Sequence, residues 1–268
     1  MRFSGKNIGA VVIQEVSAKG LLDLGLFVVS GGTISGSITY ERPAWVYDPR
    51  IIRDSYLGAF TLINGQVTTS IYRCWIGRYG QIGEGVVLGP PDHPTDWFST
   101  HPFSFTREHY QPRMYQLPDF RDLAPDDSED YSFAETLSLW THIGHEAYVG
   151  AGSFVKRGIR IGDGAVIGAG SVVTHDIPPY AIAVGAPARV VRLRFPEPVV
   201  ERMLALRWWR FNLAPHKHKV NFSKVEATLD YFEQRCAEGT LEMLSPDTYR
   251  VTRDAGNFRA EQLAAPLY

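Results

Sequence analysis

The feature that most constrains this chain is a period of six residues that runs from Ile143 to Val173. A period of six fits neither a helix nor a simple alternating strand. It predicts a coil of three short strands, with eighteen residues per turn, in which each inward side chain stacks on its copy in the next turn. The recurring aliphatic residues are Ile143, Val149, Val155, Ile161, Ile167 and Val173. The residues two positions before them, five of which are small, are Thr141, Ala147, Ser153, Ile159, Ala165 and Ser171.

Glycine follows the aliphatic residue directly in four of these hexapeptides, at Gly144, Gly150, Gly162 and Gly168. We expect these glycines to supply the backbone angles that a tight corner needs. No single turn can bury its own faces, so several turns must stack. A fainter set of sixes precedes the strong one, with a slip around the segment TTSIYR, where we expect a bulge. Its members are Leu57, Ile63, Ile76, Ile82 and Leu88.

The pattern divides the chain into three parts. Residues 1–50 have strand and turn character without clear sixes, and we expect a β-rich N-terminal cap there. Residues 51–194 form the repetitive domain, which is interrupted by an insertion at about 89–140. Residues 195–268 begin with prolines and then place apolar residues at helical spacing, which predicts C-terminal helices that could cover the open end of the coil.

Composition narrows the function classes. The 268 residues carry a formal charge of −2, which gives no global attraction to nucleic acid or to anionic membranes. The apolar run LGLFVV is too short to span a bilayer, and the N-terminus has no signal-peptide pattern, so we expect a cytoplasmic protein without a transmembrane segment. Cys74 and Cys236 lie far apart in sequence, which argues against a disulfide framework or a zinc site.

The sixes, the insertion carrying DHPTDW, and the run IGDGAVIGAGSVVTHDIPPYAIAVGAPARVVR together resemble hexapeptide acyltransferases. Within these, the chain is most similar to the xenobiotic acetyltransferase subgroup, which includes chloramphenicol, streptogramin and polysaccharide O-acetyltransferases. The similarity covers roughly residues 57–210. It implies a mainly β fold, a left-handed parallel β-helix with a long catalytic loop insertion and C-terminal α-helices. It also implies a homotrimer that uses acetyl-coenzyme A and no metal.

The resemblance makes His93, the histidine of DHPTDW, the catalytic residue, carried by a loop to a cleft between two subunits. Chemistry supports this independently, because a neutral imidazole with a pKa near 6.5 suits proton removal from an acceptor at neutral pH. Asp96 could orient the ring or stabilise its charged form, and a backbone carbonyl could do the same.

Coenzyme A is extended and anionic, so its arm needs backbone partners and its phosphates need cations or other donors. Here His175 replaces the family's usual lysine, which weakens a phosphate contact, and Tyr148 replaces a frequent tryptophan but keeps an aromatic face. The donor-binding residues that the resemblance implies are Tyr148, Ala151, Ala169, Thr174, His175, Arg189 and Arg192.

We expect the insertion to shape the acceptor pocket, because it is rich in aromatic residues that suit a sugar ring or a flat small molecule. Analogy with sugar O-acetyltransferases favours a hydroxyl acceptor on a carbohydrate or another small hydroxylated molecule. The aromatic residues are Trp97, Phe98, Phe103, Phe105, Tyr110, Tyr115, Phe120 and Tyr131.

Three alternatives stay open at this stage. The chain could transfer an acyl group to the amine of a nucleotide-linked amino sugar. It could be a γ-type carbonic anhydrase with His142 and His145 as zinc ligands, although their spacing of three differs from the five expected in that family. It could also be a β-helix that binds a ligand without catalysis.

Overall fold

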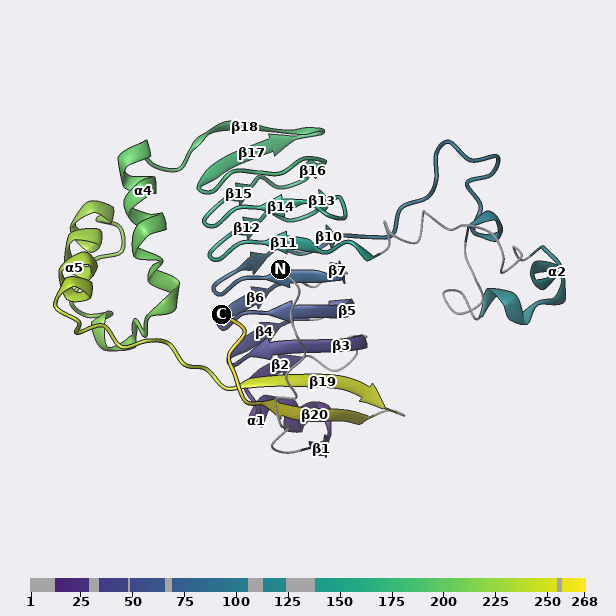
Figure 1. Ribbon diagram of the computed structural model, residues 1–268, viewed down its shortest axis with the longest axis horizontal. Helices are drawn as coiled ribbons and strands as arrows, with labels where there is room; N and C mark the ends of the chain where they lie inside the picture. Colours follow the sequence, from purple (N-terminus) through teal and green to yellow (C-terminus); the bar gives the residue numbers. More distant parts are fainter. Residues whose placement is uncertain are drawn as a thin grey trace.

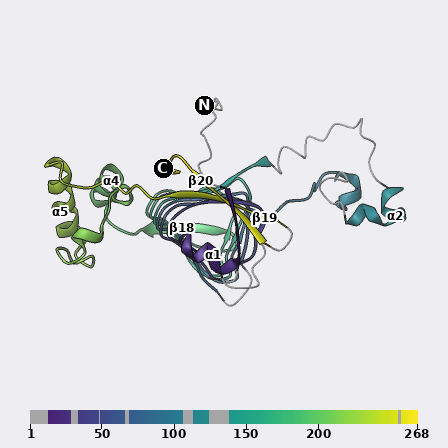
Figure 2. The ribbon, with the colours of Figure 1, turned by 90° about the horizontal axis from the view of Figure 1, so that it is seen from below.

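The computed structural model describes residues 13–28, 34–47, 49–65, 69–105, 113–123, 138–254 and 257–268. Its central part is a three-sided prism of stacked, mostly parallel strands (Figure 1). Two helices lie on one side of the prism, and the insertion projects from the other side (Figures 1 and 2). The fold is therefore mainly β and is a parallel β-helix, as the six-residue period predicts.

The first face of the prism is an eight-stranded sheet. Its first seven strands pair in parallel, and β18 closes the sheet by pairing antiparallel with β17. The strands are β2 (Leu26–Val28), β4 (Ala44–Val46), β6 (Thr61–Ile63), β9 (Gln81–Ile82), β12 (Tyr148–Val149), β15 (Val166–Ile167), β17 (Ala181–Gly185) and β18 (Ala188–Leu193).

The other two faces belong to one twelve-stranded sheet, because the long strand β5 pairs with strands of both. The second face contains β3 (Ile34–Glu41), β5 (Pro49–Leu57), β7 (Thr69–Tyr72), β10 (Val87–Leu88), β13 (Phe154–Val155) and β16 (Val172–Val173). The third face contains the end of β5 and then β8 (Cys74–Ile76), β11 (Thr141–Ile143) and β14 (Arg160–Ile161).

The predicted inward residues form the core of the prism. All six aliphatic residues from Ile143 to Val173 are at most 2% exposed. The parallel ladders place copies eighteen residues apart directly beside each other, as in the pairs Val149–Ile167 and Val155–Val173. The residues two positions earlier are buried as well, so the interior of each corner is filled. Burial of this stacked aliphatic column is the main favourable term that stabilises the coil.

The expected role of the glycines that follow the aliphatic residues was wrong. Gly150 does not have a positive φ; instead, a side chain there would place its Cβ 2.6 Å from the backbone nitrogen of Ala169 in the next turn. The left-handed corner position falls two residues later, at Gly152, and recurs at Gly170 with a φ of 68°. Glycine at the first position therefore permits close stacking of turns, whereas glycine at the second supplies the corner angle.

The predicted slip near TTSIYR is present. The inward residues Ile63, Ile71 and Ile76 are fully buried, but they are separated by eight and five residues instead of six. Arg73, at a φ of 47°, makes the corner between β7 and β8. The departure from six thus marks a corner of different length and does not end the coil.

The coil begins earlier than the faint sixes indicate. The strands β2, β3 and β4 lie within residues 1–50, yet they pair in parallel with β4, β5 and β6 of the prism. The end of the prism next to β2 and β3 is covered by α1 (Ala18–Asp23) and by three antiparallel strands (Figure 1). These strands are β1 (Ile13–Val16), β19 (Thr248–Asp254) and β20 (Asn257–Leu263), and β19 pairs with β3. The C-terminal part therefore contributes strands as well as helices, and a division at residues 50 and 194 stays a prediction.

The two predicted C-terminal helices are α4 (Glu197–Leu206) and α5 (Val225–Ala237). They pack against each other around a separate apolar cluster that includes Leu206, Leu229 and Phe232. Short 3₁₀ turns, η3 (Trp208–Arg210) and η4 (Ala214–His216), connect them. They lie beside the prism. The opposite end of the prism, which we expected these helices to cover, is formed by the β17–β18 hairpin (Figure 1). None of the helices in the described ranges is long and apolar enough to cross a membrane.

A buried ion pair joins distant parts of the chain. Arg78 donates to Glu41 from Nε at 2.7 Å and from Nη2 at 2.8 Å, and both side chains are at most 2% exposed. The C-terminal segment reaches the same place, because the Leu267 N–H donates to Glu41 and the Tyr268 hydroxyl donates to the Ile76 carbonyl. A paired and hydrogen-bonded arrangement is what makes buried charges tolerable.

Candidate active site

The insertion leaves the prism after β10 and returns at β11, at the edge between the second and third faces. Arg157, in the following turn of the coil, holds its stem by donating from Nε to the carbonyls of Gly89 at 2.9 Å and Pro90 at 3.2 Å. Both views show the insertion extending away from the prism (Figures 1 and 2). Its described elements are η1 (Pro102–Ser104), η2 (Met114–Gln116) and α2 (Pro118–Arg121).

His93 lies near this stem and is exposed. Its Nδ1 is 2.7 Å from the carbonyl oxygen of Thr100. A carbonyl only accepts hydrogen bonds, so this contact assigns the proton of the neutral ring to Nδ1 and leaves the lone pair on Nε2. The edge-on ring of Phe105, with centroids 5.1 Å apart, supports the imidazole from the side. The ring is thus oriented as a base with an accessible nitrogen.

The orienting group is a backbone carbonyl in this chain. Asp96 is exposed, and within the described part of the chain no hydrogen bond or ion pair joins it to His93. Thr100 had no signal in the sequence, because any residue can present a carbonyl. Arg157 was also missed; its place in the hexapeptide VKRGIR, next to the insertion in space, becomes apparent only once the turns are stacked. A role of Asp96 stays a prediction.

The expected donor residues lie in three places on the prism: on the first face, at the corner between the first and second faces, and at the corner between the second and third faces. Ala151 and Ala169 occupy successive copies of one corner, where the Gly170 N–H donates to the Ala151 carbonyl at 2.8 Å. A Cβ placed at Gly152 or Gly170 would meet no atom within 4 Å, so the outside of this corner is open. Tyr148 projects from the adjoining first face and is 40% exposed. The corner therefore offers an unobstructed ridge beside an aromatic side chain.

The remaining donor candidates are more dispersed. Thr174 and His175 follow β16 at the other edge of the second face, where the Thr174 hydroxyl lies 2.9 Å from His175 Nδ1. Arg189 and Arg192 are exposed on β18, and each donates to the carbonyl of an adjacent residue, Ala188 and Leu193 respectively. The structure brings Ala151 and Ala169 together, and Thr174 and His175 together, but it does not gather all seven residues at one point of a single chain.

His142 and His145, the ligands of the zinc alternative, face different environments. The His145 Nδ1 accepts a hydrogen bond from the Arg78 N–H at 3.0 Å, and the ring stacks on Trp209 with centroids 5.0 Å apart. Burial, with the nearby charges of Arg78 and Arg207, lowers the pKa of His145 to about 4. Burial also lowers the pKa of His142. Within the described ranges, no three metal-ligating side chains converge.

The described aromatic residues of the insertion differ in burial, and Trp97, Phe103 and Phe120 are half-buried. Phe105 and Tyr115 are buried, whereas Phe98 is fully exposed. Tyr110 and Tyr131 lie outside the described residues. An acceptor pocket lined by this set stays a prediction.

The comparisons with known proteins agree with the repetitive fold. A family model described as the hexapeptide repeat of succinyl-transferase matches residues 141–175. A chloramphenicol acetyltransferase of Agrobacterium fabrum is 35% identical over 140 residues, which cover 51% of this chain and 59% of that protein. A probable macrolide acetyltransferase of Lysinibacillus sphaericus is 31% identical over 142 residues, covering 51% of this chain and 69% of the relative. The chain thus spans about three fifths of the length of the first of these relatives.

A solved structure of a mutant of AntD, an N-acyltransferase from Bacillus cereus in complex with dTDP and coenzyme A, shares the fold. It has a TM-score of 0.50 and 15% sequence identity, and it covers 72% of this chain and 97% of that one. The stacked six-residue turns and the inserted loop define a hexapeptide-repeat β-helix protein. With the macrolide acetyltransferase relative, they establish that the chain belongs to the hexapeptide-repeat acetyltransferases.

Proposed function

We propose that this protein is an acetyl-coenzyme A-dependent O-acetyltransferase that acts on a carbohydrate or another small hydroxylated acceptor. The observation that carries the proposal is the orientation of His93 by the Thr100 carbonyl, on a loop held at the edge of a hexapeptide-repeat prism. Family membership supplies the reaction class, and the ring geometry supplies a base that fits it.

In the proposed reaction, His93 Nε2 removes the proton of the acceptor hydroxyl as the oxygen attacks the thioester carbonyl. The tetrahedral intermediate collapses, the carbon–sulfur bond breaks, and the imidazolium returns its proton to the leaving thiolate. The Nδ1–H bond to Thr100 would stabilise the imidazolium that forms between the two proton transfers. A base of this kind contributes about 10²- to 10⁴-fold in rate.

We further propose that the site is completed by a second chain of a homotrimer. The stem of the insertion and the open corner at Ala151 lie on opposite edges of the second face, and β13 (Phe154–Val155) separates them. The insertion also points away from its own prism (Figure 2). Both observations favour a loop that serves the donor ridge of a neighbouring prism.

The donor would lie along the ridge formed by Ala151 and Ala169. The open space outside Gly152 and Gly170 leaves room for the pantetheine arm, and Tyr148 offers an apolar ring beside it. The exposed Arg189 and Arg192 would meet the phosphates, with a smaller contribution from Thr174 and His175.

The first experiment is a screen of hydroxyl and amine acceptors with acetyl-coenzyme A that measures the release of free thiol. We expect transfer to hydroxyl acceptors. Transfer to amino sugars alone would support the N-acyltransferase alternative, and coenzyme A binding without turnover of any acceptor would support a non-catalytic role.

The substitution His93→Ala should then lower turnover by at least about 10²-fold, while the circular dichroism spectrum and the oligomeric state stay unchanged. His101→Ala is the matched control, because His101 lies on the same insertion. Its Nδ1 accepts a hydrogen bond from the Phe103 N–H, so its ring is not held by a carbonyl as the ring of His93 is. Equal turnover in His93→Ala and the unmodified protein would remove His93 from the mechanism.

A further inference from the structure

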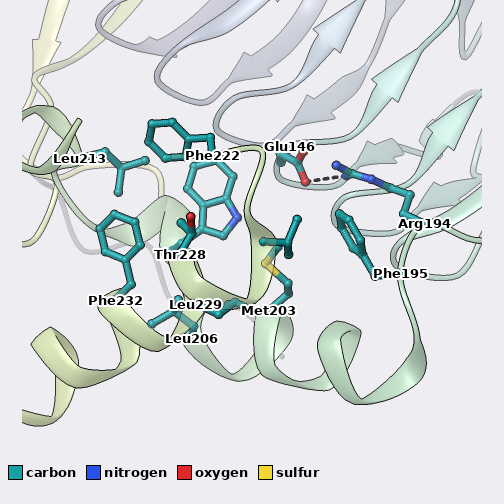
Figure 3. Close-up of a pocket in the computed structure, with 12 residues that line it drawn as sticks. Glu146, Arg194, Phe195, Met203, Leu206, Leu213, Phe222, Thr228, Leu229 and Phe232 are labelled. Carbon is teal, nitrogen blue, oxygen red and sulfur yellow. Dashed lines mark hydrogen bonds and ion pairs between the residues drawn. The ribbon is translucent and has the colours of Figure 1, made fainter. Parts of the chain in front are cut away.

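A pocket lies between the two C-terminal helices and the side of the prism (Figure 3). It has a volume of about 210 Å³. Its wall on the helical side is apolar and includes Met203 and Leu206 from α4 and Leu229 and Phe232 from α5. None of the residues expected to bind the donor or to act on the acceptor lines it, so it is separate from the candidate active site.

The opposite wall of the pocket is polar. Arg194 donates from Nη1 to Glu146 Oε2 at 2.8 Å (Figure 3). The same nitrogen donates to the Gly164 carbonyl at 2.6 Å, so Arg194 ties two successive corners of the prism together. The Arg194 guanidinium also lies over the ring of Phe195, at 5.1 Å from its centroid. An apolar helical wall cannot pack closely on this ion pair without burying charges, and this explains why space remains between them.

We propose that this pocket is a binding site for a small uncharged amphiphile, consisting of an apolar ring or short alkyl chain with one hydroxyl or amide group. A cavity of about 150 Å³ is large enough to hold a benzene ring, so a pocket of about 210 Å³ has room for such a ring and a small polar group. The apolar part of the ligand would contact Met203 and Leu229, and its polar group would meet Glu146 and Arg194.

The charges at the polar end determine the class of head group. Glu146 presents a second carboxylate oxygen, and Arg194 presents N–H groups beyond Nη1, so a hydroxyl can donate to the first and accept from the second. A ligand with a net charge would lose hydration against the apolar wall, and its attraction to one member of the pair would be offset by repulsion from the other. A neutral hydrogen-bonding group is therefore favoured over a carboxylate or an amine.

The test uses methionine labelled with ¹³C at the methyl group. Met203 lines the pocket, whereas Met114 lies in the insertion and Met243 is an exposed residue after the helices. Titration with p-cresol should shift the Met203 methyl resonance saturably, with a Kd on the order of 1 mM, and should leave those of Met114 and Met243 unchanged. An unchanged Met203 resonance at about 10 mM p-cresol, or shifts of the Met114 and Met243 resonances as large as that of Met203, would overturn the proposal.

Two variants locate the ligand. Val225→Phe places a ring in the pocket and should abolish the Met203 shift, whereas Val220→Phe enlarges a residue of the same helical cluster that does not line the pocket and should preserve it. A shift of equal size in both variants would place the ligand elsewhere and contradict the assignment. The measurement on the unmodified protein stands on its own if either variant fails to fold.

A third comparison tests the head group. p-Toluate should bind at least about tenfold more weakly than p-cresol, because its carboxylate faces Glu146. In Glu146→Gln the order should reverse, since Arg194 then lacks its anionic partner. An order that is the same in both proteins would overturn the role given to the ion pair. None of these measurements involves turnover, so they stand or fall separately from the proposed acetyl transfer.

Discussion

The stacked turns and the insertion differ in how their sequences relate to their structures. In the turns, a short repeated pattern sets which side chains are inside, and those residues are almost fully buried. The sequence of the insertion has no period, the described parts of it contain only short helical turns, and His93 and Phe98 are exposed there. The difference indicates that the turns act as a rigid scaffold, whereas the residues available for chemistry lie on the irregular segment that the scaffold holds.

This comparison predicts that stability depends mainly on the prism. In Arg78→Met, Glu41 would stay buried without its charged partner, and the free energy of unfolding should fall by about 3–5 kcal/mol. Chemical denaturation measures the change. The double variant with Glu41→Met should recover part of the loss, because no unpaired charge then remains. A loss below about 1 kcal/mol in the single variant would show that the pair does not secure the prism.

The second prediction concerns acid stability. The folded pKa of His145 is about 4, below its ordinary value of 6.5, so between these values the unfolded chain binds the extra proton. The contribution is therefore fully present above pH 6.5 and is lost as the pH falls towards 4, to a total of about 3 kcal/mol. Unfolding curves of the unmodified protein and His145→Gln should converge over this range. A constant difference between them would contradict the inference.

The third prediction separates the two glycine positions of a turn. Gly150→Ala places a Cβ against the backbone of the next turn and should disturb stacking, whereas Gly170→Ala meets no neighbouring atom and should cost only the left-handed backbone penalty, about 1–2 kcal/mol. Thermal unfolding should rank Gly150→Ala as the less stable variant. The reverse ranking would show that the corner angle at Gly170 matters more to stability than the close approach of the turns at Gly150.

The smallest effect on stability is expected in the insertion. Phe98 is fully exposed, so Phe98→Ala should change the free energy of unfolding by no more than about 0.5 kcal/mol. If the insertion forms the acceptor site, the same variant should raise the KM for the acceptor. A clear loss of stability would show that the insertion is part of the structural core, and the division between a rigid prism and a functional insertion would then not hold.

Much of the prism could be predicted from the sequence. The six-residue period identified the inward residues from Ile143 to Val173, and the helical spacing of apolar residues after the prism identified the C-terminal helices. The period failed before residue 51, where longer strands and corners of unequal length hide the six-residue spacing. The strands β19 and β20 were also missed. They pair with each other as a hairpin, but the sheet that they join is completed by β3 and β1, which lie more than two hundred residues earlier in the chain.

The sequence by itself determined which side chains face inward and which histidine stands inside the irregular insertion, because these follow from local spacing and residue type. Only the tertiary structure decided that the Thr100 carbonyl orients His93, that Arg157 holds the stem of the insertion, and that Glu41 pairs with Arg78. Contacts of this kind depend on the path of the whole chain, and a backbone carbonyl carries no signature in the sequence. The same is true of the pocket beside Arg194, which exists because two surfaces of unlike polarity meet.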